Sequence, residues 1–189
     1  MPRIPYARPE DMTPEVRAAV EKAPINVMRM LAGTSPSVFE AYGKYAAAFF
    51  APGGLPPDLR ELAILRVGYL SHADYETNGH ETFGRKVGLS DSHIAAIRHG
   101  GQHPDTLSPV QQAVLDFTEE VTLKVRASDA ALAAVRKHLG NRQVLDLIML
   151  IGLYMTVCRL LETTGVEADA VSPDKMGITL PGQSKPLGQ

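Results

Sequence analysis

The chain has 189 residues, of which 44% are hydrophobic and 21% are charged, values typical of a single globular domain with a substantial core. The formal net charge of −2 gives no electrostatic basis for binding nucleic acid or an acidic membrane surface. A single cysteine, Cys158, rules out a disulfide framework and fits a reducing compartment.

Two further features bear on location. Residues 1–5 have no apolar signal core. The longest uncharged apolar run, residues 147–158, has twelve residues, whereas about 20 are needed to cross a bilayer. We interpret this run as a buried core helix, and we expect a cytoplasmic protein with no membrane partner.

Helix-start and helix-stop signals recur along the chain, and no β alternation interrupts them. Serine, threonine or proline opens most of the expected helices, and glycine follows most of them. In chain order these helices cover about residues 14–22, 25–31, 36–50, 58–71, 74–87, 91–99, 109–125, 129–139 and 141–163. The sequence thus predicts an all-α fold, with one helical domain over residues 1–171 and an extended C-terminal tail over 172–189.

One expected helix carries a carboxylate, Glu61, inside an otherwise apolar pattern. A buried carboxylate is costly unless it is paired or protonated. The alternative is a surface carboxylate paired with Arg60 or Arg66, but the apolar neighbours leave little polar face around Glu61.

The next helix places Glu76 and His80 four residues apart, on one face. Such pairs are common on solvated helices. In an apolar setting, however, a carboxylate beside an imidazole raises the imidazole pKa and fixes its tautomer. Glu61, Glu76 and His80 are therefore the candidate catalytic residues, and they indicate proton-transfer chemistry.

These residues resemble the signature of the carboxymuconolactone decarboxylase family, which includes the alkylhydroperoxidase-D-like (AhpD-like) proteins. That signature is Arg-Glu-Leu on one helix and Cys-x-x-Cys-x-x-x-His at the start of the next. Residues 60–62 match the first part and His80 matches the histidine. Ala73 and Glu76 stand where the two cysteines would be.

The resemblance is close over residues 55–100 and looser over 25–168. It implies an AhpD-like helical bundle that needs no cofactor and assembles as a homo-oligomer, most often a trimer or hexamer, with dimers also known. A helix face such as residues 45–50 could be buried between subunits. With a single thiol, a peroxidase cycle through an intramolecular disulfide is not expected.

A metal site is an alternative, because His72, Glu76 and His80 fall at four-residue steps and could hold zinc or iron. The family helix begins near Ala73, which places His72 in the preceding turn. The family also works without metal in general, so we expect none.

Four polar residues near the motif are candidates for substrate binding. Tyr69, Tyr75 and Asn78 could line a pocket, and Arg85 could clamp a substrate carboxylate. For Tyr75 core packing is at least as plausible, and for Arg85 a surface ion pair is the more ordinary interpretation.

The sequence is compatible with three functions. The first is a cofactor-independent decarboxylase-type enzyme acting on a small carboxylated unsaturated lactone or related aromatic catabolite. The second is a lyase or isomerase of the same fold with another carbonyl substrate. The third is a non-catalytic helical binding protein, in which Glu61 would be exposed or paired away from His80.

Overall fold

The computed structural model describes residues 1–171, so the predicted tail over 172–189 lies outside the described residues. Within that range every regular element is helical, which confirms the all-α prediction. The elements are η1 (Pro9–Asp11), α1 (Pro14–Lys22), α2 (Asn26–Leu31), α3 (Pro36–Ala48), α4 (Pro57–Leu70), α5 (Asp74–Lys86), α6 (Asp91–His99), α7 (Pro109–Lys124), α8 (Asp129–Arg136) and α9 (Asn141–Thr164).

The helix starts agree closely with the sequence signals because capping side chains fix them. Thr13, Ser90, Ser108 and Ser128 each accept a hydrogen bond from the backbone N–H three residues further on. The ends differ by a few residues, as for α3, which stops at Ala48 and not at residue 50. The short 3-10 helix η1 was not predicted.

The chain forms two compact units, and one consists of residues 1–53 together with the segment that begins at Leu161. Within it α1 contacts α3. Hydrogen bonds join the segments from the two ends of the chain: the N–H of Arg3 donates to the carbonyl of Thr164 at 2.6 Å, and the N–H of Asn26 donates to the carboxylate of Asp169 at 2.7 Å. A single domain over residues 1–171 stays a prediction.

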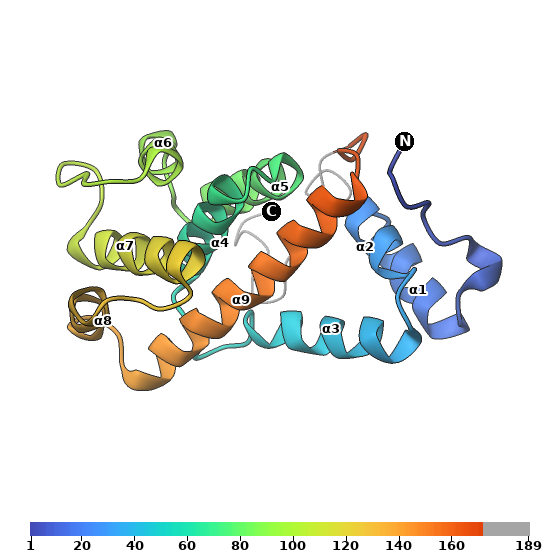
Figure 1. Ribbon diagram of the computed structural model, residues 1–189, viewed down its shortest axis with the longest axis horizontal. Helices are drawn as coiled ribbons and strands as arrows, with labels where there is room; N and C mark the ends of the chain where they lie inside the picture. The colour runs from blue at the N-terminus through green and yellow to red at the C-terminus, as the bar shows by residue number, and fades with distance from the viewer. Residues whose placement is uncertain (172–189) are drawn as a thin grey trace, which may run out of the picture. The chain divides into compact units, whose positions relative to one another are not determined.

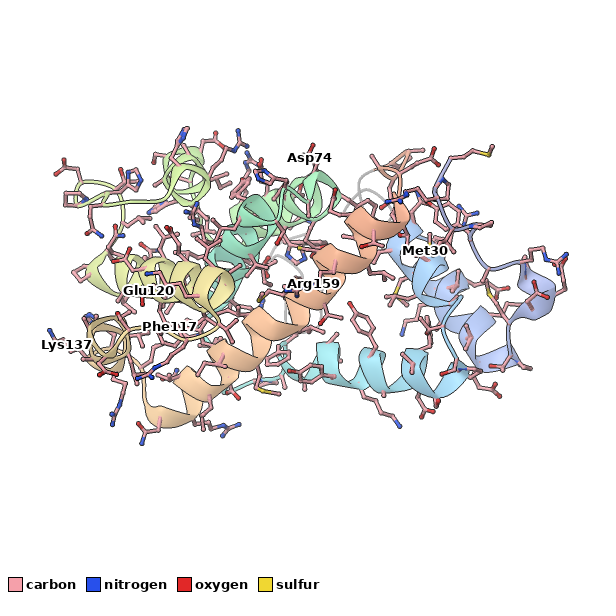
Figure 2. All side chains as sticks on the ribbon, viewed as in Figure 1. Met30, Asp74, Phe117, Glu120, Lys137 and Arg159 are labelled. Carbon is pink, nitrogen blue, oxygen red and sulfur yellow. The ribbon has the colours of Figure 1, made fainter. Side chains whose placement is uncertain are left out.

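The other unit, Gly54–Leu160, is built around α4 (Figure 1). Helices α5, α6 and α7 pack on α4, and α8 packs on α7. Every residue of α4 from Leu59 to Gly68 is buried. Phe117 of α7, labelled in Figure 2, adds a large apolar side chain that is 1% exposed. A helix enclosed on all sides explains why its charged residues are also out of water.

Close packing of α4 on α5 depends on a glycine. A Cβ added at Gly68 would lie 2.8 Å from Cγ2 of Thr77, which is closer than carbon atoms tolerate. Gly68 therefore lets the two helices approach, and this approach sets how far a side chain on α5 must reach to meet one on α4.

The long helix α9 is, by length and composition alone, able to cross a membrane. The sequence predicted this helix over about residues 141–163, close to its observed bounds, and the twelve-residue run judged too short to cross a membrane was only its uncharged part. Half of the apolar stretch of α9 is buried within the protein, and Leu147, Leu150 and Tyr154 are among its buried residues. Core helices have the same length and composition, so this feature is weak evidence for a membrane span.

Candidate active site: a buried histidine between two carboxylates

The structure brings the three candidate catalytic residues into one hydrogen-bonded group. Nδ1 of His80 lies 2.7 Å from Oε2 of Glu61, and Nε2 of His80 lies 3.0 Å from Oε1 of Glu76. Glu61 comes from α4, while Glu76 and His80 come from the first two turns of α5, which begins at Asp74, labelled in Figure 2. The imidazole therefore has a carboxylate at each ring nitrogen.

All three side chains are removed from water, but to different degrees. Glu61 is 0% exposed, whereas Glu76 is 6% and His80 is 8% exposed. Glu61 has a second cationic neighbour, because Nε of Arg60 lies 3.3 Å from its Oε1. With His80 protonated, the cluster of two carboxylates, one imidazolium and one guanidinium carries no net charge. This balance is what makes its burial tolerable.

The two carboxylates determine the protonation state of His80. Burial alone would lower the pKa of the imidazolium, but the charges and hydrogen bonds of Glu61 and Glu76 raise the pKa of His80 to about 10. At neutral pH both ring nitrogens then carry a proton, and each donates to a carboxylate. In this state neither ring nitrogen of His80 has a lone pair available to accept a proton.

Two aromatic rings fix the plane of the imidazole. Phe83 of α5 and Tyr154 of α9 meet the His80 ring edge-on, with centroids at 5.7 Å and 5.2 Å. Both aromatic residues are buried. Packing on two sides restricts rotation of the ring, so the nitrogens stay directed at their carboxylates.

Two of the predicted substrate-binding residues belong to a different cluster, which is centred on Glu81. The hydroxyl of Tyr69 donates to Glu81 at 2.8 Å, and Arg98 and Arg85 pair with the same carboxylate at 2.7 Å and 3.3 Å. Burial and the bond to Glu81 raise the pKa of Tyr69 to about 12. Arg85 is exposed and also pairs with Asp91 at 2.9 Å. This cluster ties α4, α5 and α6 together.

The remaining two candidates, Tyr75 and Asn78, lie on α5 with Glu76 and His80. Asn78 is exposed, on a different face of the helix from the buried pair, and Tyr75 is half-buried. The substrate-binding roles of all four residues stay predictions. Cys158 is 1% exposed, in keeping with a packing residue.

His72 lies in the turn between α4 and α5, as the sequence indicated, and its φ is 53°. It is exposed, unlike Glu76 and His80. Among residues 1–171 no group of three histidine, cysteine or acidic side chains is arranged to hold a metal ion.

Residues 36–120 match the model of the Carboxymuconolactone decarboxylase family. The predicted family resemblance is confirmed. The matched region runs from the start of α3 into α7, and it includes Glu61, Glu76 and His80. A comparison with curated proteins gives no significant match.

Solved structures confirm the AhpD-like fold. A peroxidase-related protein with an alkylhydroperoxidase AhpD core from Ralstonia eutropha JMP134 has a TM-score of 0.76 at 21% identity, over 89% of this chain and 93% of that one. A putative antioxidant defence protein AhpD from Agrobacterium tumefaciens gives 0.65 at 21%, over 72% and 94%. The debrominase Bmp8 in complex with 2,3,4-tribromopyrrole gives 0.70 at 13%, over 90% and 92%.

Three residues that shape the site around Glu61 and His80 were not predicted to do so from the sequence. Arg60 was expected as part of the family motif and as a possible surface ion-pair partner of Glu61, but not as a buried member of the cluster, although its place in the apolar pattern beside Glu61 was a usable signal. Gly68 and Tyr154 carried no such signal, because a glycine within a helix and a tyrosine in an apolar run are common in helices of every function.

Proposed function

We propose that the protein is a cofactor-independent enzyme that performs acid–base chemistry on a small carboxylated unsaturated lactone or a related aromatic catabolite. The observation that carries this proposal is the placement of His80 between two buried carboxylates. Burying a protonated imidazole and two carboxylates carries a large desolvation penalty, which apolar side chains in the same place would avoid. Groups with strongly shifted pKa values concentrate at functional sites.

The proposed reaction is a decarboxylation followed by protonation. When the substrate loses CO2, the electron pair of the broken C–C bond passes into the conjugated lactone carbonyl as a dienolate. His80 then donates a proton to the carbon skeleton and becomes neutral. It regains a proton from solvent water, and Glu61 completes this relay at Nδ1. Glu76 orients the imidazole in the resting enzyme. Desolvation of the leaving carboxylate in the apolar site favours the first step.

A lyase or isomerase of the same fold is the alternative. The same trio would then move a proton next to a carbonyl group in a different substrate. The non-catalytic alternative is disfavoured by a specific observation, because it requires Glu61 to be exposed or paired away from His80. Glu61 is 0% exposed and lies 2.7 Å from His80.

The test is turnover of 4-carboxymuconolactone, followed by ultraviolet absorbance of the enol-lactone. We expect the wild type to turn over, and His80→Ala to lose at least about a hundredfold in kcat, the usual contribution of a general acid. His138→Ala is the matched control, because His138 is exposed and lies in the turn that follows α8. Equal rates for His80→Ala and His138→Ala would reject the proposed role.

A further inference from the structure

The two carboxylates on His80 are held unequally. Glu61 is wholly buried and faces two cations, His80 and Arg60. Glu76 is the more exposed of the two, and among residues 1–171 its one hydrogen-bond or ion-pair partner is His80. Glu76 is therefore the carboxylate that can leave the imidazole at the lower cost.

The charge balance limits how an anion could enter. The cluster of Arg60, Glu61, Glu76 and His80 is neutral with His80 protonated. A further anion beside it would leave one unpaired negative charge out of water, which is strongly unfavourable. Exchange of one carboxylate for another keeps the balance, so an anionic ligand must replace a carboxylate and not join the two.

The start of α5 would still stabilise the Glu76 carboxylate after it left His80. Glu76 is the third residue of α5, in the first helical turn. Backbone N–H groups at the start of a helix favour a negative charge there, whether or not the side chain contacts His80. Movement of the side chain toward solvent thus retains part of its electrostatic stabilisation.

We infer that Glu76 is an internal placeholder, and that an anionic oxygen of a small carboxylic-acid ligand takes its position at Nε2 of His80. The inference rests on the proposed function, because it treats the trio as a substrate site. The ligand class is then a small carboxylic acid, and the atom that binds its anionic oxygen is Nε2 of His80. Glu61 stays on Nδ1 throughout and keeps the imidazole protonated and oriented.

The test uses acetate, which has the size of the group that Glu76→Ala removes. Acetate binding is followed by the shift of the His80 ring ¹⁵N signals and by thermal unfolding, against sodium chloride at the same ionic strength. We expect Glu76→Ala to bind acetate with a dissociation constant at least tenfold lower than that of the wild type. The melting temperature of the variant should rise with acetate accordingly.

Two controls locate the effect. Glu162→Ala removes an exposed glutamate from α9 and should behave as the wild type. The double variant Glu76→Ala/His80→Gln lacks the imidazolium and should lose the gain in acetate binding. If Glu76→Ala does not fold, Glu76→Gln keeps the shape, removes the charge, and should show the same direction of change.

Equal acetate affinity in wild type and both Glu76 variants, or acetate binding that leaves the His80 signals unmoved, would overturn the inference. The measurement is made at equilibrium and needs no turnover. If 4-carboxymuconolactone is not turned over, the proposed reaction is rejected, but the replacement of Glu76 by an anionic ligand is not. Unchanged acetate affinity in an enzyme that turns over rejects the exchange alone.

Discussion

Nδ1 of His80 lies 2.7 Å from Oε2 of Glu61, although the two residues are 19 positions apart and belong to different helices. The contact fixes α5 against α4 and at the same time sets the charge of the imidazole. Glu76 is paired with the other ring nitrogen, so both nitrogens of His80 face a carboxylate and neither faces a neutral group. Its protonation state follows from its two neighbours.

The first prediction concerns the protonation of His80. Since the neighbouring carboxylates raise the pKa of His80 to about 10, the ring should stay doubly protonated from pH 6 to 9. Ring ¹⁵N shifts measured across this range should be constant, and should change only near pH 10. His80→Gln identifies the signals. A transition near pH 6.5 would contradict the geometry of the site.

The second prediction concerns stability against pH. The pKa of His80 in the folded protein, about 10, lies above the value of 6.5 for an unperturbed histidine. The folded state therefore binds this proton more tightly than the unfolded chain does. The stabilisation is fully present below pH 6.5 and is lost as pH rises toward 10. Urea unfolding at pH 6.5, 8 and 9.5 should show a falling difference between wild type and His80→Gln, and a constant difference would be inconsistent with this.

The third prediction is that Glu61→Gln destabilises the protein by about 3–5 kcal/mol, the usual cost of breaking a buried ion pair from one side. The change leaves Arg60 and His80 without their shared carboxylate. The pKa of His80 should fall as well, because a main source of its elevation is removed. Denaturant unfolding and ¹⁵N titration measure the two effects. Glu162→Gln, an exposed glutamate, is the control and should change neither.

The fourth prediction compares two glycines. Gly68→Ala should cost about 1–3 kcal/mol, because its Cβ would press on Thr77 and separate α4 from α5. Gly79→Ala, on α5, meets no atom within 4 Å and should be neutral or stabilising by up to about 1 kcal/mol. Thermal unfolding compares the two. If Gly68→Ala is as stable as Gly79→Ala, the helices do not depend on this close approach.

The fifth prediction tests the role of Tyr69. Its hydroxyl donates to Glu81 at 2.8 Å, and no hydrogen bond described for residues 1–171 joins it to His80. Tyr69→Phe should therefore lower stability by about 1 kcal/mol through the lost hydrogen bond, and leave KM and the His80 signals unchanged. A clear rise in KM would instead support the predicted role of Tyr69 in substrate binding.

The helices and their starts were largely predictable from the sequence, since serine and threonine caps and glycine stops act over a few residues and need no tertiary contact. The motif residues were predictable for a similar reason. The four-residue spacing of Glu76 and His80 places them on one face of any helix that contains them. Glu61 stood out as a carboxylate in an apolar pattern, and the family resemblance linked it to His80.

Tertiary structure alone decided what those residues do to one another. Only the crossing of α4 and α5, allowed by Gly68, places Glu61 on His80. Only burial on every side of α4 turns Arg60 from a surface cation into part of the cluster. The same packing brings Tyr154 from α9 against the imidazole. Local signals in the sequence specify which residues share a helix face, whereas electrostatics depend on distance and solvent exclusion, which arise only when separate helices pack.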